Sequence, residues 1–269
     1  MQEKIEMLKR FISRFNRVII AFSGGVDSAT LSAFCKDIVE VLAVTVRSKT
    51  NPSREIEKAI RISKEIGIKH RFLDVDIFQV ENFAENSELR CYYCKKFIIK
   101  KLENLAIKEN YDAIFEGTNA SDLLSYRPGY RAVLECKIAF SPWAKFGITK
   151  EEVRSLARSM GLSFYNDPPL SCLATRIPYG SKITPEKLEM IDLAENFVIK
   201  FAGVENVRVR CIEDFAVIEV EKDEVRKVLD KREIIKNSLL KTGFKKIFVN
   251  PEGYRMGVIA RNFENFIEL

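Results

Sequence analysis

Six consecutive residues near the N-terminus have the types that bind phosphate groups: Ser23-Gly24-Gly25-Val26-Asp27-Ser28. The two glycines allow a tight turn and a close approach of the backbone to an anion. The two serines add hydroxyl donors, and a helix after them would direct free N–H groups at the same anion. Asp27 beside phosphate indicates either a bridging Mg²⁺ or a role in organising the loop. The pattern predicts a loop that binds nucleotide phosphates.

Other readings of this loop explain less of it. A turn without a ligand would account for the two glycines, since Ser-Gly and Gly-Gly are common turn signals. It would leave the two serines and the acid unexplained. A Walker loop is excluded because no Gly-Lys-Ser/Thr follows at the required spacing. A dinucleotide-binding fingerprint lacks its third glycine.

Three of the six cysteines have spacings that suit metal or sulfur chemistry. Cys91 and Cys94 stand three residues apart, and Cys172 follows far along the chain in a proline-rich stretch. Three thiolates are too few for a structural zinc site, but they can hold three irons of a [4Fe–4S] cluster. A redox pair or two partly buried side chains would explain Cys91 and Cys94 equally well. The other cysteines fall in apolar patterns and are expected in the core: Cys35, Cys136 and Cys211.

The composition bounds the class of protein. A chain of 269 residues suggests two domains, and its net charge of +6 suits a phosphate-bearing substrate. The basic residues are scattered, so nucleic acid is an unlikely partner. No segment has the apolar length of a membrane span, and the charged N-terminus is unlike a signal peptide. We therefore expect a cytoplasmic protein with reduced cysteines.

Strand and helix patterns alternate through the first half of the chain. The apolar runs predict strands at 18–22, 41–46, 71–75 and 113–116, and the intervening patterns predict helices at 29–36, about 51–66 and 95–108. Asn51 and Pro52 are expected as the cap and first-turn proline of the second helix, which ends before Gly67. Such alternation predicts a doubly wound parallel α/β sheet, with its ligand at the carboxyl ends of the strands.

The second part of the chain has a different pattern. Thr149-x-x-Glu152 is a capping box that opens a helix, and the irregular stretch 166–183 follows it. Beyond this stretch the sequence predicts a helix from Thr184-Pro185, a hairpin at 207–210 and 216–220, a helix at 224–242 and a strand at 246–249. We expect two domains, residues 1–165 and residues 166–269, the second a small α+β domain.

Ser-Gly-Gly-Val-Asp-Ser after an apolar strand resembles the signature of the PP-loop ATP pyrophosphatases. The resemblance implies an adenine nucleotide alpha hydrolase-like domain over residues 1–165 that binds ATP with Mg²⁺. Such enzymes adenylylate a carbonyl or carboxylate oxygen, release pyrophosphate and let a nucleophile displace AMP. The resemblance implies the following nucleotide-binding positions: Ala21, Phe22, Ser23, Gly24, Gly25, Val26, Asp27, Ser28, Val46, Gly117, Thr118 and Arg127.

Three further segments are similar to the LarE family of ATP-dependent sulfur transferases: residues 116–122, 126–131 and 171–180. With them the similarity extends from the loop at Ser23 to the strand at 207–210. It implies conversion of a carboxylate of pyridinium-3,5-biscarboxylic acid mononucleotide to a thiocarboxylate for the nickel-pincer nucleotide cofactor. One branch of the family sacrifices the sulfur of the cysteine at Cys172. Another has three cysteines and a [4Fe–4S] cluster that carries sulfide, and this chain resembles the second.

The family resemblance also implies roles for individual residues. Cys172, Asp27 and Arg176 are the expected catalytic residues, and the cluster ligands would be Cys91, Cys94 and Cys172. Arg208 and Arg210 would hold the substrate phosphate; two residues apart on a strand, they share a face. A solvated basic stripe would explain these two arginines as well. The C-terminal domain would serve substrate binding, sulfur transfer and assembly into a homo-oligomer.

Two further assignments leave alternatives open. Arg127 and Arg176 would stabilise the acyl-adenylate or the substrate carboxylate, since a planar guanidinium suits both groups. Either could instead pair with an acid such as Asp122 or Asp167. A pair of acids is expected to hold a cation near the triphosphate: Glu195 and Glu219.

Three other functions remain open on the sequence. A tRNA thiolase can also combine a PP-loop with three cysteines, but such enzymes usually carry Lys where this chain has Val26. An ammonia-using PP-loop ligase leaves the three cysteines unexplained. A nucleotide-binding module without catalysis leaves the complete serine and aspartate loop unexplained.

Overall fold

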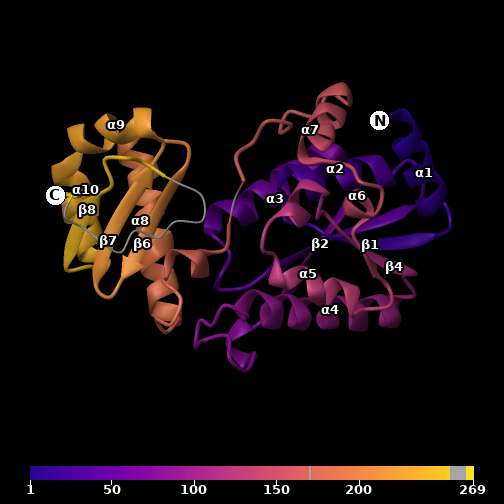
Figure 1. Ribbon diagram of the computed structural model, residues 1–269, viewed down its shortest axis with the longest axis horizontal. Helices are drawn as coiled ribbons and strands as arrows, with labels where there is room; N and C mark the ends of the chain where they lie inside the picture. Colours follow the sequence, from indigo (N-terminus) through magenta and orange to yellow (C-terminus); the bar gives the residue numbers. More distant parts are fainter. Residues whose placement is uncertain (170, 255–264) are drawn as a thin grey trace. The chain divides into compact units, whose positions relative to one another are not determined.

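A five-stranded parallel sheet forms from the apolar runs of residues 17–140, in the order β3-β2-β1-β4-β5 (Figure 1). The computed structural model describes residues 1–169, 171–254 and 265–269. The strands are β1 Arg17–Ala21, β2 Glu40–Arg47, β3 Lys69–Asp74, β4 Ala113–Glu116 and β5 Ala139–Phe140. The chain builds outward from β1 to β3 and then returns to the other side of β1. The predicted doubly wound α/β sheet is confirmed, and its strand order reverses between β1 and β4.

Helices cover both faces of this sheet because successive side chains of a strand point to opposite faces. Val18 and Ile20 pack with α1 and α2, whereas Ile19 between them packs with α4 and α5. Figure 1 shows the two helical layers above and below the strands. The helices of the first face are α1 Gln2–Ile12, α2 Val26–Cys35, α3 Ser53–Ile66 and α7 Lys150–Ser159, and those of the second are α4 Arg90–Glu109 and α5 Pro128–Leu134.

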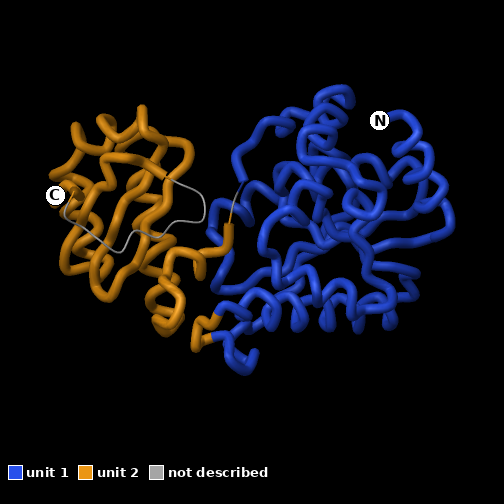
Figure 2. The backbone as a smooth tube through the Cα atoms, viewed as in Figure 1, with its two compact units in different colours: residues 1–83, 88–170 blue, residues 84–87, 171–269 orange. Residues whose placement is uncertain are grey.

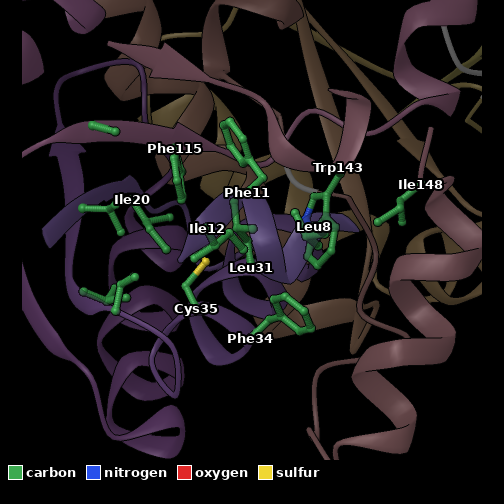
Figure 3. Packing of buried hydrophobic residues seen from close by; sticks show 14 of the residues in the cluster. Leu8, Phe11, Ile12, Ile20, Leu31, Phe34, Cys35, Phe115, Trp143 and Ile148 are labelled. Carbon is green, nitrogen blue, oxygen red and sulfur yellow. The ribbon is translucent and has the colours of Figure 1, made fainter. Parts of the chain in front are cut away.

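A cluster of large apolar side chains lies behind the phosphate loop (Figure 3). Trp143, from the short helix α6 Pro142–Lys145, is fully buried there beside Phe34. Its indole N–H donates to the carbonyl oxygen of Asp27 at 3.0 Å, so the loop is joined to the core. Cys35 belongs to the same cluster, as expected, and burial raises the pKa of its thiol.

The C-terminal residues form a small α+β unit of their own. Its sheet has the order β6-β7-β8-β9, with an antiparallel hairpin of β6 Val207–Ile212 and β7 Phe215–Val220. The other elements are β8 Lys246–Val249, β9 Ile267–Glu268, α8 Pro185–Ala202, α9 Val225–Asp230 and α10 Arg232–Lys241. The prediction of a single helix at 224–242 is wrong, because two helices meet there at Lys231. Cys211 is buried in this unit, which raises the pKa of its thiol to about 11.

The chain divides into two compact units, residues 1–83 with 88–170 and residues 84–87 with 171–269 (Figure 2). The sequence predicts the domain boundary at residue 166, but Asp167 still belongs to the first unit. Its carboxylate pairs with the Lys58 ammonium at 2.8 Å. Leu170, which ends the first unit, lies outside the described residues. Within the described part of the chain, no helix is both long and apolar enough to cross a membrane.

Two helix caps test the local sequence signals. The Thr149 hydroxyl accepts from the Glu152 amide and the Glu152 carboxylate accepts from the Thr149 amide, so the predicted capping box is confirmed. The prediction for Asn51 is wrong: Pro52 is the N-cap of α3. The side chain of Asn51 instead accepts from the backbone and hydroxyl of Ser48, which closes the preceding turn.

Replacing the cap of α7 should weaken the first unit. Thr149→Ala removes the oxygen that accepts the Glu152 amide, so we expect the free energy of unfolding to fall by about 1 kcal/mol. Urea titration followed by tryptophan fluorescence measures this, because Trp143 is the only tryptophan and lies in this unit. Thr149→Ser keeps the oxygen and should stay close to the wild type. Equal losses in both variants would contradict a capping role.

Candidate functional site

The phosphate loop lies where the strand order reverses. β1 ends at Ala21, opposite Glu116 at the end of β4, and α2 begins at Val26. Gly24 has φ +70°, and a Cβ there would come 2.9 Å from the Ala59 Cα of α3. Only glycine therefore suits this position, since other residues would be strained in φ and would collide with backbone. The carboxyl edge of the sheet at such a reversal is the usual ligand position in this architecture.

The two serines of the loop are joined to each other and to its backbone. The Ser28 hydroxyl lies 3.2 Å from the Ser23 hydroxyl and accepts from the Ser23 amide at 3.2 Å. The Ser23 hydroxyl accepts from the Gly25 amide at 3.2 Å. These bonds hold the loop in a turn around the N-terminus of α2 before any ligand binds, and a preformed loop costs less ordering when an anion arrives.

Asp27 is the junction of three segments. One carboxylate oxygen accepts from the Asn119 amide at 3.1 Å, and the other pairs with the ammonium of Lys150 at the start of α7. Its own carbonyl accepts the Trp143 indole. The side chain is about one-fifth exposed, so a carboxylate oxygen is within reach of a cation that arrives with ATP. One carboxylate is a normal protein contribution to Mg²⁺ bound with phosphates.

A buried acid and a lysine that the sequence reasoning did not assign complete this edge of the sheet. Glu116 is buried, and its carboxylate pairs with the Lys95 ammonium at 3.1 Å. Burial alone would raise the pKa of Glu116. The charge of Lys95 and hydrogen bonds from Ser141 and Thr118 hold that pKa below its usual range. Glu116 opens the 116–122 segment, but nothing in the sequence indicated that Lys95, on α4, would face it.

A cavity of about 160 Å³ opens beside the loop. Lys95 of α4 lines it together with four predicted nucleotide-binding residues: Ala21, Phe22, Ser23 and Val46. Gly117 packs behind it, since a Cβ there would lie 2.8 Å from the Ser28 amide nitrogen. Thr118 donates its hydroxyl to Glu116 at 2.8 Å. The structure thus brings most of the predicted nucleotide-binding residues together.

Arg127 pairs with an acid, and its expected nucleotide contact stays a prediction. Its guanidinium is about half exposed and pairs with Asp122, one of the two alternative partners weighed from the sequence. It starts the turn before α5.

Cys91 and Cys94 lie on the first turns of α4. Cys91 is exposed and Cys94 is half-buried. The first turn of this helix holds no acidic residue. Gly129 of α5 packs against this turn, where a Cβ would lie 3.2 Å from the Cys91 carbonyl oxygen. The two thiols are therefore held one helical turn apart, as predicted from their spacing.

Cys172 belongs to the second unit, where it precedes a short 3-10 helix, Leu173–Arg176. Arg176 is fully buried and donates to the Ser171 carbonyl at 2.7 Å and the Cys172 carbonyl at 3.1 Å. It also donates to the hydroxyls of Ser171 and Thr175. A guanidinium without exposed surface, surrounded by acceptors of its own chain, does not suit the predicted contact with an acyl-adenylate. Arg176 instead fixes the backbone on both sides of Cys172.

Glu195 is the partner of Arg176, which corrects its predicted role as a cation ligand. Its two carboxylate oxygens accept from Arg176 at 2.7 and 3.1 Å, and one also accepts from the Val209 amide at 3.1 Å. Both side chains of the pair are fully buried. The pair joins the loop of Cys172 to α8 and to β6, and both carboxylate oxygens of Glu195 are occupied by hydrogen bonds.

Arg208 and Arg210 share one face of β6, as their spacing predicted. Each guanidinium lies over the Tyr254 ring, at 5.4 Å and 5.8 Å from its centroid. Arg210 pairs with Glu219 of β7 at 2.9 Å and donates to the Thr175 carbonyl at 2.9 Å. Burial raises the pKa of Glu219 against the opposing charge of Arg210. Glu219 is therefore a counterion of the arginine pair, and its role as a cation ligand stays a prediction.

No metal site is complete within the described residues. They contain no group of three or more His, Cys, Asp or Glu side chains placed to hold a metal ion. The predicted cluster ligands are divided between the units, with Cys91 and Cys94 in the first and Cys172 in the second.

Removing one partner of the buried pair should destabilise the second unit strongly. Glu195→Gln leaves the Arg176 charge buried without a counterion, and we expect a loss of roughly 3–5 kcal/mol. Hydrogen exchange of α8 peptides measures it. Asp214→Asn breaks an exposed pair with Lys245 in the same unit and should leave the exchange of α8 nearly unchanged. A small effect of Glu195→Gln would contradict the structural role of the pair.

Comparisons with known proteins agree with this fold and site. The family described as queuosine biosynthesis protein QueC matches residues 17–92. NMN synthetase from Francisella tularensis has a solved structure with a TM-score of 0.50 and 16% identity, covering 62% of this chain and 74% of that one. At such identity the likeness concerns the fold alone. It supports the parallel α/β fold.

Three relatives match most of the chain. An uncharacterized protein of Synechocystis is 33% identical over 97% of this chain and 98% of its own. An uncharacterized protein of Methanocaldococcus jannaschii is 34% identical over 89% and 91%. The pyridinium-3,5-bisthiocarboxylic acid mononucleotide synthase of Lactiplantibacillus plantarum is 28% identical over 90% and 88%. With matches of this extent, and with the phosphate loop formed at the reversal of the sheet, the chain belongs to the LarE family of PP-loop, ATP-utilising enzymes.

Proposed function

We propose that this enzyme adenylylates a carboxylate of pyridinium-3,5-biscarboxylic acid mononucleotide and converts it to a thiocarboxylate. The similarity to the Lactiplantibacillus plantarum synthase over 90% of the chain supports this substrate class. The product would serve the nickel-pincer nucleotide cofactor, as the family resemblance implies. A homo-oligomeric state and a cytoplasmic location accompany this proposal.

One structural observation carries the proposal: α4 joins the thiols to the nucleotide cavity. Lys95, which follows Cys94 directly, lines the cavity beside Ala21 and Ser23 and pairs with Glu116. An ammonia-using ligase has no need of thiols on this helix. Sulfur chemistry next to an adenylylation site gives Cys91 and Cys94 a use.

The activation step follows from the groups at the loop. A substrate carboxylate oxygen attacks the α-phosphorus of ATP, the bond to the bridging oxygen breaks, and pyrophosphate leaves with the electron pair. The α2 N-terminus and the Ser23 and Ser28 hydroxyls would hold the phosphates during this step. Lys95 would offset charge at the α-phosphate. Sulfur then displaces AMP, which is a better leaving group than oxide.

The arginine pair of the second unit suits the phosphate of the substrate nucleotide. Two guanidiniums on one strand face can donate to a single phosphate in parallel. Glu219 pairs with Arg210, and Arg208 donates to the side-chain oxygen of Asn206 at 2.7 Å, so both guanidiniums are held on this face. Tyr254 offers a ring face beside them.

The cysteines would hold an iron–sulfur cluster that carries the incoming sulfide. Three thiolates fit a [4Fe–4S] cluster by donor type and number, and Cys91, Cys94 and Cys172 would hold it. Held by these three thiolates, the cluster would supply an inorganic sulfide for the product. In this role Cys172 is a ligand and is not consumed.

Iron content tests the cluster. Protein purified without oxygen and reconstituted with iron and sulfide should bind about four irons, in line with the cluster type. Cys94→Ala and Cys172→Ala should lower the iron content and the visible absorbance strongly. Cys136→Ala is the control, because this half-buried thiol of the first unit packs against the core and has no proposed ligand role. Absence of iron in the wild type would refute the cluster.

Turnover tests the substrate. With ATP, sulfide and the pyridinium biscarboxylate mononucleotide, we expect AMP, pyrophosphate and a product in which sulfur replaces one oxygen, identified by mass spectrometry. Arg210→Met should raise KM for the mononucleotide more than it lowers kcat, because it removes a phosphate donor. Thiolation of tRNA in place of the mononucleotide would overturn the substrate. Dehydroalanine at position 172 after turnover would show that Cys172 itself gives up its sulfur.

A further inference from the structure

Lys150 forms an ion pair with the carboxylate of the phosphate loop. Neither the sequence patterns nor the proposed function gives this lysine a role. Its ammonium pairs with Asp27, which is the acid of the loop itself. The Lys150 side chain is about one-third exposed and the Asp27 side chain about one-fifth exposed. The pair is therefore open to a ligand from solvent.

The backbone of Lys150 is fixed independently of this ion pair. Its amide donates to the Ser121 hydroxyl at 3.1 Å, and the capping box at Thr149 holds the turn before it. Val153 and Ala157 bury the apolar face of α7 against the first unit. The ion pair is thus not needed to dock the helix, while the flexible four-carbon side chain can reach more than one acceptor.

Charge balance explains why a lysine stands there. Unliganded, the loop presents one carboxylate next to the helix N-terminus that attracts anions, and Lys150 neutralises it. ATP brings several negative charges to the same place, and its cation is attracted to the Asp27 oxygens. The ammonium then has a stronger set of acceptors, because phosphate oxygens carry more charge than the shared carboxylate.

We propose that Lys150 binds the β- and γ-phosphates of ATP and that Asp27 holds its ammonium in reach while the site is empty. This inference rests on the proposed function, since it concerns the leaving group of the adenylylation. As the bond between the α-phosphorus and the bridging oxygen breaks, charge collects on pyrophosphate. Donation from Lys150 to these oxygens lowers the energy of that state.

Two nucleotides separate this role from a structural one. Binding of an ATP analogue with a methylene bridge between its α- and β-phosphates, and of AMP, is measured by calorimetry in Mg²⁺. Lys150→Met should weaken binding of the analogue roughly ten- to a hundredfold and leave AMP within about twofold, because AMP lacks the two outer phosphates. Lys150→Arg keeps the charge and should lose less.

Lys4→Met is a matched control, because Lys4 of α1 forms a similar ion pair with an acid of α7. Lys4 pairs with Glu152 of α7 at 2.9 Å, and the side chains of this pair are 34% and 23% exposed, against 31% and 22% for Lys150 and Asp27. It lies away from the loop, so Lys4→Met should leave both affinities unchanged. Equal weakening of the analogue and AMP in Lys150→Met, or no weakening of either, would overturn the inference.

A measurement on the wild type covers the case in which Lys150→Met does not fold. Amine-reactive labelling with peptide mass spectrometry should show Lys150 protected by the ATP analogue and not by AMP, with Lys4 labelled equally throughout. If the analogue does not change the labelling of Lys150, the contact between Lys150 and the outer phosphates is refuted. If the wild type fails to bind the analogue at all, the proposed function falls. If the wild type binds the analogue and Lys150→Met binds it with the same affinity, this inference is wrong but the proposed function is not affected.

Discussion

The close approach of three backbone segments at the phosphate loop is the constraint on which the first unit depends. Gly24 lies against α3 and Gly117 lies against the Ser28 amide, with no space for a side chain at either position. These contacts bring the start of α2 to the end of β4, at the point where the sheet order reverses. A methyl group at either glycine would push the segments apart and open the anion site. The serine hydroxyls and Asp27 act only within the frame that these contacts set.

Three ion pairs near the functional residues differ in what they can do, and the burial of their side chains decides it. Arg176 and Glu195 are fully buried, so separating them would leave a charge in the core at a large cost. Their pair is structural. In the pair of Lys95 and Glu116 the lysine side chain is 30% exposed. The Lys150 side chain, paired with Asp27, is exposed to a similar extent. The Lys150 ammonium can exchange the partly exposed Asp27 carboxylate for a phosphate at little cost, whereas Lys95 must stay near the buried Glu116 carboxylate to balance its charge.

Local signals in the sequence predicted much of this structure. Hydrophobic periodicity, capping residues and turn residues predicted the sheet, the capping box of α7 and the hairpin that carries Arg208 and Arg210. Each of these features depends on residues that are close in the sequence. Contacts between distant segments were beyond such signals. Nothing near Arg176 indicated that Glu195 would bury it, and its expected catalytic role came from the family resemblance. Lys95 and Lys150 were missed for the same reason: their acids lie on other elements, and only the folded sheet brings them together.

Residues 84–87 belong to the second unit although they precede α4 in the chain. The buried Asn86 amide donates to the carbonyls of Ile177, Pro178 and Ser181, at 3.3, 2.7 and 2.9 Å. These acceptors emerge from the ribosome more than ninety residues later. The second unit is therefore complete only after residues 84–87, which lie within the sequence of the first unit, have bound these later segments. A single cut between the units would also leave this amide without its acceptors, so neither half should be obtained intact by simple truncation.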